Sequence, residues 1–305
     1  MRHNKNCKIL MKKLKYYIYR LRWILAPFFK NGLLTHIDIE LNTSCNQKCL
    51  SCWHSSPDTK PINLRMNKSK LSHLLVGASL AGIKAVKFNL RGEPLCSTDL
   101  KLAVELANKI GYTDIMINTN GILLDKKKAI ELDRAGLTTC IISVDSLEAK
   151  TYCKIHGCDM ADYGNLISNL DDLRKYKVAG LINFNIKLNF HINKINESEN
   201  VEKYKDVFPM FDVIIRYTEN RKGTHIAIER QRKRKRACPH MKRRLTVMAD
   251  GKIYPCCVCY DEPKDILLSK DFKEALQKRK NLIKNYRKGF LPVSCQNCTS
   301  GDIYK

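Results

Sequence analysis

Three cysteines lie close together in the stretch CNQKCLSCWH, which runs from Cys45 to His54. They are separated by three and then by two residues, a spacing that suits metal ligation by thiolates. His54 would complete a zinc site, but structural zinc sites usually pair their ligands across two separated knuckles, and this is one short loop. Three thiolates on a four-iron cluster leave one iron open to a ligand that is not protein. The loop therefore predicts an iron–sulfur cluster with a vacant position for a cofactor or reactant.

A second group of cysteines lies near the C-terminus, at Cys238, Cys256, Cys257, Cys259, Cys295 and Cys298. The C-x2-C pair at 295–298 can bind a metal from one turn, and two upstream cysteines would complete four ligands. Cys257 and Cys259 compete with Cys256 for one of these positions. Four cysteines suit zinc as well as a four-iron cluster, so both remain candidates for this site.

Composition limits the classes of protein to which the chain can belong. The 305 residues are 44% apolar, which is enough for a large domain with its own core. We find no secretory pattern and no apolar run of membrane-spanning length, so we expect a cytoplasmic protein whose 14 cysteines are ligands or core residues rather than disulfides. The net charge of +25 suits a polyanionic partner, but it fits equally well a bias towards lysine in the source genome.

The elements that position the cysteines follow an α/β pattern. From residue 35, short β-branched runs alternate with helical periodicity, which is typical of parallel strands joined by helical crossovers. The predicted strands are Ile37–Leu41, Ala85–Asn89, Asp114–Asn118, Thr139–Val144, Ile182–Phe190 and Asp212–Tyr217. The predicted helices are Asn67–Leu80, Asp99–Ile110, Asp125–Ala135, Asn165–Tyr176 and Glu197–Phe208, with an N-cap at Ser97 or Thr98 and helix-ending glycines at 111 and 136.

Four segments are expected along the chain. Residues 1–34 form a basic N-terminal helix, 35–217 the α/β domain, 218–237 a basic linker and 238–305 a small cysteine-bearing domain. Within the first, residues 8–29 carry apolar side chains three and four apart among lysines and arginines. We favour docking of this helix on its own domain, with peripheral contact to an anionic membrane as the alternative. In the last segment, Asp250-Gly251 predicts a two-residue hairpin turn.

The ordered motifs resemble those of the radical S-adenosylmethionine enzymes. Cys45, Cys49 and Cys52 resemble the family's C-x3-C-x2-C signature. Further along the chain, LRGEPL is similar to the GGEP motif with Arg91 in place of its first glycine, INTNG is similar to the Thr-Asn-Gly turn, and ISVDS and YCKIHG are similar to the segments that follow. The resemblance covers residues 35–217. It implies a partial (βα)6 TIM-like barrel whose three cysteines hold a [4Fe-4S] cluster that binds S-adenosylmethionine.

The resemblance also implies roles for particular residues. Gly92 and Glu93 would meet the methionyl amine of the cofactor, while Asn120, Ser143 and Asp145 are candidates for its ribose or carboxylate. Bound in this way, S-adenosylmethionine would be cleaved by one electron to a 5′-deoxyadenosyl radical that abstracts hydrogen from the substrate. An electron donor such as flavodoxin or ferredoxin is implied as a partner.

The C-terminal cysteines resemble a shortened SPASM, or twitch, domain. The spacing C-x12-G-x4-C, followed by C-x2-C, runs from Cys238 through Gly251 and Cys256 to Cys298. The resemblance implies one auxiliary [4Fe-4S] cluster, held by Cys238, Cys256, Cys295 and Cys298. Family members with one such cluster dehydrogenate an aminocyclitol alcohol or a peptidyl serine or cysteine.

Three functions are therefore weighed. The first is the oxidation or cross-linking of a substrate, such as a sugar-like small molecule or a peptide, assisted by the auxiliary cluster, with Arg216 and Glu219 as candidates to remove the substrate's proton. The second is a peptide-modifying or sulfatase-maturase-like enzyme of the same chemistry. The third is a zinc-containing nucleic-acid-binding protein, prompted by RQRKRKRACPH; it is disfavoured because the basic run lacks interleaved aromatics for base stacking.

Overall fold

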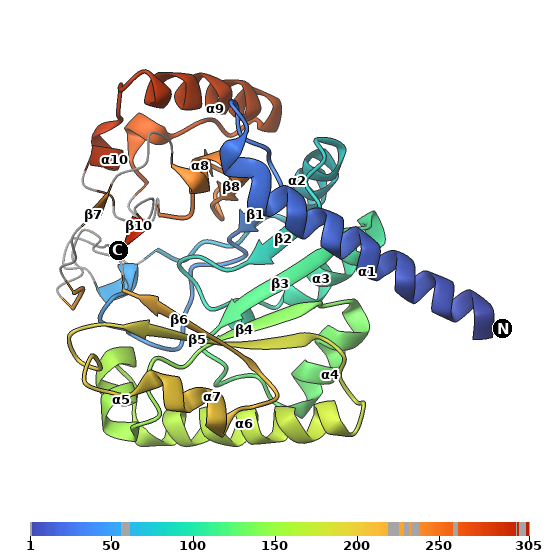
Figure 1. Ribbon diagram of the computed structural model, residues 1–305, viewed down its shortest axis with the longest axis vertical. Helices are drawn as coiled ribbons and strands as arrows, with labels where there is room; N and C mark the ends of the chain where they lie inside the picture. The colour runs from blue at the N-terminus through green and yellow to red at the C-terminus, as the bar shows by residue number, and fades with distance from the viewer. Residues whose placement is uncertain are drawn as a thin grey trace.

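The computed structural model describes residues 2–55, 62–218, 226–228, 232–233, 238–258, 262–296, 298 and 303–304. Its centre is a curved sheet of parallel strands with helices on the outer face (Figure 1). The strands in chain order are β1 His36–Ile39, β2 Ala85–Phe88, β3 Asp114–Thr119, β4 Thr139–Ser143, β5 Asn185–Ile192 and β6 Asp212–Tyr217. The sheet continues through β8 Arg244–Val247 to β9 Ile253–Tyr254, in the order β6-β5-β4-β3-β2-β1-β8-β9. The two edge strands, β6 and β9, do not pair with each other, so the sheet is open and the fold is a partial barrel.

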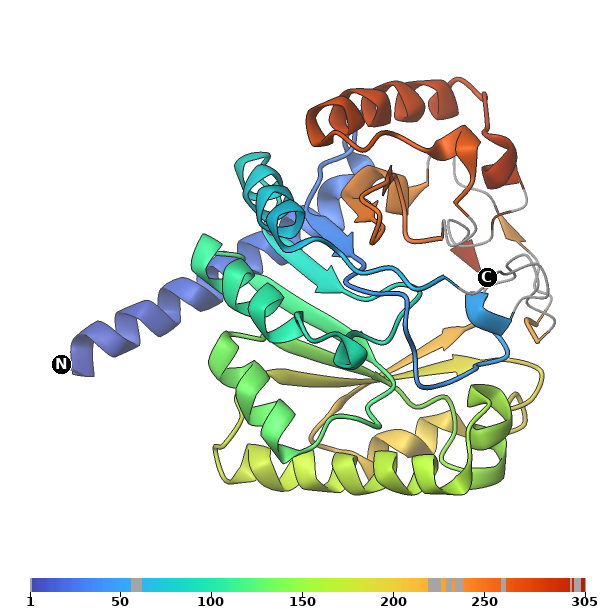
Figure 2. The ribbon, with the colours of Figure 1, turned by 180° about the vertical axis from the view of Figure 1, so that it is seen from behind.

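Six α-helices connect the barrel strands. They are α2 Lys68–Leu80, α3 Leu100–Ile110, α4 Lys126–Ala135, α5 Ala149–His156, α6 Met160–Val178 and α7 Tyr204–Val207, and the short 3-10 helices η2 Trp53–Ser55, η3 Pro94–Cys96 and η4 Val201–Lys203 lie between them. Seen from behind, α2, α3, α4 and α6 cover the sheet in succession (Figure 2). All four residues of β1 are buried, as expected for a central parallel strand covered on both faces.

The six predicted barrel strands are confirmed, with small differences at their ends. Three local predictions were wrong. The structure has a helix, α5, that was not expected, and Asp99 rather than Ser97 or Thr98 occupies the N-cap of α3. In place of a twelve-residue helix over 197–208 it has only η4 and α7. There the backbone bonds span two or three residues rather than the four of an α-helix, as from the Val201 N–H to the Glu199 carbonyl at 3.0 Å and from the Lys203 N–H to the Asn200 carbonyl at 3.2 Å.

The segment after residue 238 joins the barrel sheet. β8 pairs with β1 in parallel, with Leu245 beside Ile37, and β9 returns antiparallel to β8. The turn between them differs from the predicted two-residue turn, because the strand pairing ends at Val247 and Ile253 and only Gly251 has a positive φ, of 85°. The remaining elements are α8 Pro239–Arg243, η5 Lys264–Ile266, α9 Phe272–Arg287, α10 Val293–Gln296, and the pair β7 Arg232–Lys233 and β10 Ile303–Tyr304.

The N-terminal helix α1, Arg2–Leu25, continues into η1, Ala26–Phe28, and projects beyond the body of the molecule in both views (Figures 1 and 2). Its inner face docks on the barrel, where Tyr19 is buried against Ala85 and Met116. Lys242 donates to the carbonyls of Pro27 and Phe29 at 2.6 and 3.0 Å. The favoured prediction of docking is thus confirmed for one face of this helix. Within the described residues, no helix is long and apolar enough to cross a membrane.

Candidate functional site

The three cysteines of the predicted cluster lie in the loop between β1 and α2. Cys45, Cys49 and Cys52 are all half-buried, and none of the three forms a disulfide. Burial, together with the neighbouring Cys52 thiol, raises the pKa of Cys49 well above its ordinary range, and burial raises that of Cys45 to about 12. A thiolate is therefore costly here without a positive partner. The iron of a cluster supplies that charge, so the donor set fits the group implied by the motif.

The C-terminal end of α5 holds this loop in place. The N–H groups of Lys48 and Leu50 donate to the carbonyls of His156 and Ile155 at 3.2 and 2.9 Å. Gly157, at φ 59°, lies so close that a Cβ atom would be 2.4 Å from the Lys48 carbonyl oxygen. The motif YCKIHG therefore serves as a support for the cysteine loop.

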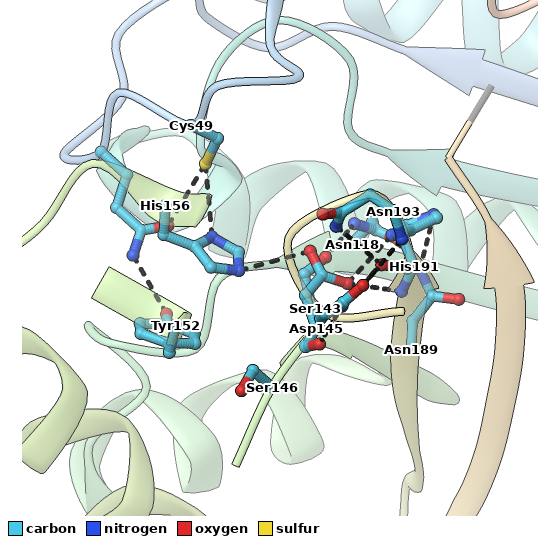
Figure 3. Close-up of polar contacts among 12 residues, drawn as sticks. Cys49, Asn118, Ser143, Asp145, Ser146, Tyr152, His156, Asn189, His191 and Asn193 are labelled. Carbon is cyan, nitrogen blue, oxygen red and sulfur yellow. Dashed lines mark hydrogen bonds and ion pairs between the residues drawn. The ribbon is translucent and has the colours of Figure 1, made fainter. Parts of the chain in front are cut away.

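A chain of polar side chains runs from the cysteine loop to the carboxyl ends of β4 and β5 (Figure 3). Cys49 Sγ lies 3.3 Å from Nδ1 of His156, whose Nε2 lies 3.3 Å from Oδ2 of Asp145. Oδ1 of Asp145 lies 3.1 Å from Nδ1 of His191 and accepts from the His191 N–H at 2.7 Å. Burial acts to raise the pKa of Asp145, but His191 and His156 outweigh it and hold this pKa well below its usual range. The Asp145 carboxylate thus faces both imidazoles and accepts the backbone N–H of His191.

Polar side chains from β3, β4 and β5 gather beside this chain of contacts. Asn118 Nδ2 lies 3.4 Å from Ser143 Oγ, and Asn189 donates to the His191 ring at 3.2 Å. The Asn189 side-chain oxygen is buried, and none of the described residues donates a hydrogen bond to it. An unpaired buried acceptor costs about 1–3 kcal/mol.

The turn after β2 is packed directly against the cysteine loop. A Cβ atom on Gly92 would lie 2.1 Å from Asn42 Oδ1 and 2.3 Å from the Asn42 carbonyl oxygen, so only glycine fits. The buried Glu93 carboxylate accepts from Thr119 Oγ1 at 2.7 Å and from the N–H groups of Leu95 and Asn120, both at 2.9 Å. Because its carboxylate is occupied, any contact of this turn with a ligand amine falls to its backbone.

The predicted cofactor residue Asn120 is also engaged within the protein. Its side-chain amide donates to Asn46 Oδ1 at 2.7 Å, and its side-chain oxygen accepts from the Ile122 N–H at 3.1 Å. The Glu93 and Asn120 contacts together tie the turns after β2 and β3 to the cysteine loop.

Arg91, which replaces a glycine of the family motif, is a fully buried link between three parts of the chain. Its Nε and Nη2 donate to Glu40 Oε1 and Oε2 at 2.7 and 2.6 Å, and its Nη1 donates to Glu262 at 2.8 Å. Its guanidinium lies 5.1 Å from the ring centroid of Trp53, next to Cys52. His54 Nε2 lies 2.9 Å from the Arg91 carbonyl oxygen. His54 therefore contacts the backbone of this turn through Nε2, which is a structural role and not that of a metal ligand.

The second cysteine set gathers around α8, β9 and α10. Burial, and beyond it the nearby Cys298 thiol, raises the pKa of Cys238. Arg244 donates to Cys257 Sγ at 3.1 Å and to buried Asp38 at 3.2 Å. The structure thus brings Cys257 to a cationic partner, while Cys259 lies outside the described residues.

Cys295 connects the second set to the site. It packs against the small apolar cluster of Met248, Tyr254 and Ile266, which also contacts Leu90. Leu90, at φ 102°, immediately precedes Arg91. Across the described ranges no three His, Cys, Asp or Glu side chains converge on one point as ligands of a single metal ion would. The thiolates of a four-iron cluster bind different irons and need no such convergence.

Sequence reasoning missed His191, Asn189 and the part played by His156. Arg216, which it did propose, lies on β6 directly beside His191 in the β5–β6 pairing. Glu219 lies outside the described residues. The signal for His191 was the polar residue pattern NFHIN at the end of the fifth strand, where side chains of an α/β barrel face the site.

Comparison with known proteins supports the motifs. The Radical SAM superfamily model matches residues 39–199. The chain is 27% identical over 278 residues to the "Probable GTP 3',8-cyclase" of Methanosarcina mazei, covering 76% of this chain and 80% of that one.

Two solved structures share the fold. One is anSMEcpe with bound AdoMet, at a TM-score of 0.60 and 18% identity, covering 84% of this chain and 81% of that one. The other is BtrN in complex with AdoMet and 2-DOIA, at a TM-score of 0.56 and 17% identity, covering 88% and 94%. With the family model spanning more than half of its length, and with the cysteine loop at the carboxyl end of β1, this chain belongs to the radical SAM superfamily.

Proposed function

We propose that this radical SAM enzyme is an oxidoreductase, acting on a sugar-like or peptidyl substrate, with an auxiliary four-iron cluster in its second cysteine set. The packing of that set against the turn after β2 carries the proposal. Leu90 and Cys295 pack on the same apolar cluster, and Arg91 is bound by Glu262 of the same C-terminal segment. A redox group at these cysteines would be close enough to the barrel to take an electron from a substrate radical.

The cofactors would be held by residues at the carboxyl ends of the strands. Cys45, Cys49 and Cys52 would ligate the first cluster, and Cys238, Cys256 or Cys257, Cys295 and Cys298 the second. The bound cluster and S-adenosylmethionine supply a 5′-deoxyadenosyl radical that abstracts a hydrogen atom. The backbone of Gly92 and Glu93 would receive the methionyl amine. Because both imidazoles lie against the Asp145 carboxylate, the ribose would fall to Ser143.

Oxidation then requires the substrate radical to lose one proton and one electron. His191 is suited to take the proton, because its side chain is 36% exposed while Asp145 orients its ring from the buried side. Arg216, its neighbour on β6, would stabilise the negative charge that develops on a substrate oxygen as it loses its proton. The auxiliary cluster would take the electron, and a reduced flavodoxin or ferredoxin would supply the electron that starts each cycle.

Iron content and deoxyadenosine release test the proposal without knowledge of the substrate. Anaerobically reconstituted protein should hold about eight irons per chain and release 5′-deoxyadenosine when reduced with S-adenosylmethionine. Changing Cys45, Cys49 and Cys52 to Ala should abolish that release. Cys295→Ala with Cys298→Ala should lower the iron count to about four and leave the release intact.

Controls make these outcomes specific. Cys153→Ala, a half-buried thiol of α5 outside both sets, should change neither the iron content nor the release. Zinc in place of iron, or an unchanged iron count in the Cys295/Cys298 variant, would refute the corresponding cluster. With a substrate in hand, His191→Gln should retain deoxyadenosine release but slow product formation about 100-fold or more.

A second candidate is a radical rearrangement of a guanosine nucleotide, which the name of the Methanosarcina relative suggests. The observation in its favour is the 27% identity over 80% of that relative's length. Adding GTP to the reconstituted enzyme would distinguish the two functions. A GTP-dependent rise in deoxyadenosine release with consumption of the nucleotide would favour the second, whereas a rise only with a sugar alcohol or peptide would favour the first.

A further inference from the structure

The N-terminal helix has two apolar faces, and only one of them is covered by the protein. Tyr19 and Ala26 are buried, and Trp23 packs beneath Arg243, whose guanidinium lies 3.9 Å from its ring centroid. On the opposite side of the helix a second apolar face lies in solvent, with Leu14 59%, Tyr17 67%, Leu21 57% and Phe28 81% exposed. We call this outer apolar face, formed by Leu14, Tyr17, Ile18, Leu21, Ile24, Leu25 and Phe28, the α1 stripe.

The α1 stripe follows the geometry of one continuous helix surface. Its members are spaced three and four residues apart, so at 100° per residue they share a single side of the helix. Exposed apolar residues that occur singly need no explanation, but a contiguous stripe of this kind marks an interaction surface.

The charges around the α1 stripe identify its partner. Residues 1–37 contain six lysines, three arginines and no acidic residue. Lys15 and Lys30 are exposed, and Arg20 and Arg22 are half-buried beside the stripe. A second copy of the chain would bring these cations against their own kind, and a nucleic acid would leave the apolar stripe without an apolar partner. An anionic lipid surface satisfies both properties at once.

We propose that the α1 stripe seats this enzyme on an anionic membrane surface, with the helix lying in the plane of the lipid headgroups. The part of the chain described here has no helix able to span a bilayer, so the attachment is peripheral. α1 packs near the start of β2, at Ala85, whereas the cysteine loop follows the carboxyl end of β1. The catalytic site would therefore remain accessible while the enzyme is bound.

Vesicle flotation of the full-length protein tests the proposal. The chain should float with vesicles in which one third of the lipid is phosphatidylglycerol, and remain behind with vesicles of pure phosphatidylcholine. Leu14→Asp with Leu21→Asp should abolish flotation, because both side chains lie on the stripe. Lys15→Gln with Lys30→Gln should weaken the partition coefficient about 25-fold, which is about fivefold for each cation.

A matched pair elsewhere on the surface provides the control. Leu80 and Val178, the last residues of α2 and α6, are 84% and 70% exposed. Leu80→Asp with Val178→Asp introduces the same charge and should float like the wild type. The melting temperature and deoxyadenosine release should be unchanged in both aspartate variants, since neither pair touches the cysteine loop.

Three results would overturn the proposal. The first is a wild-type protein that does not float with anionic vesicles. The second is a Leu14/Leu21 variant that still floats. The third is a wild-type protein that is dimeric and a Leu14/Leu21 variant that is monomeric, with neither bound to vesicles. The last would identify a second copy of the chain as the occupant of the stripe.

Discussion

The buried Arg91–Glu40 pair gives the sharpest test of how this fold is held together. Neither side chain has any exposed surface, and the two are joined by two hydrogen bonds of 2.6 and 2.7 Å. Arg91→Met removes the guanidinium and its charge, and among the described residues it leaves the Glu40 carboxylate with the N–H groups of residue 91 and Ala249, at 3.2 and 2.9 Å. Removing one partner of a buried pair costs about 3–5 kcal/mol, because the other charge is left uncompensated.

The size of the effect separates this pair from surface ion pairs. We expect Arg91→Met to lower the free energy of unfolding by about 3–5 kcal/mol, against a typical total of about 5–15 kcal/mol. Arg174→Met removes an arginine whose shortest bond to Asp171 is 2.8 Å, yet both side chains are nearly half exposed. It should cost less than about 1 kcal/mol. Urea unfolding followed by far-UV circular dichroism measures both values.

A double-mutant cycle with Glu40 tests whether the unpaired Glu40 charge is what destabilises the Arg91→Met variant. Glu40→Gln alone should destabilise the protein, because among the described residues it leaves Glu262 as the carboxylate paired with the Arg91 guanidinium. In the Arg91→Met background the same change should recover about 1–3 kcal/mol, since it removes the unpaired buried charge while keeping an acceptor for the backbone. A loss below about 1 kcal/mol for Arg91→Met, or further destabilisation on adding Glu40→Gln to it, would refute this reasoning.

Three further predictions follow from single sites. Gly92→Ala should destabilise the protein by about 1–3 kcal/mol, because the added Cβ atom would clash with the chain just before the cysteine loop. Gly164→Ala, at a position with open space around it, should stabilise α6 by up to about 1 kcal/mol. Thermal melts compare the two variants. His156→Phe keeps a ring in place but removes the nitrogen that lies 3.3 Å from Cys49. Loss of one hydrogen bond to a cluster ligand should lower the reduction potential of the first cluster by about 20–60 mV, measured by an EPR titration. An unchanged potential would mean that His156 does not donate to the cluster ligand. Burial acts to raise the pKa of Asp38, but Lys87, His36 and Arg244 around it hold this pKa far below its ordinary value. The carboxylate therefore contributes stability above about pH 4 that is lost as the pH falls. Asp38→Asn should therefore flatten the fall in unfolding free energy between pH 5 and pH 3, and an equally steep fall in the variant would assign the acid sensitivity to other groups.

Local patterns were sufficient for the barrel and for the chemistry of the first loop. Buried parallel strands are short apolar runs between turn residues, so all six could be found without tertiary information. The short helix α5 escaped notice because eight residues make only about two turns and its N-cap, Glu148, makes no side-chain capping bond. The predicted helix over 197–208 formed only in part, because its first residues close tighter turns and the Glu199 side chain is bound by Ser146 and Tyr204.

The sequence by itself determined the ligand chemistry of this protein, since three thiols at fixed spacing in one loop can be recognised along a single stretch of chain. Only the tertiary structure decided how that loop is supported. Arg91 meets Glu262 across 171 positions, and Asp145 meets His191 across 46. Contacts at such separations depend on the order and register of the strands, which no local pattern encodes. The same holds for α1, whose two apolar faces look alike in the sequence until the barrel covers one and leaves the other in solvent.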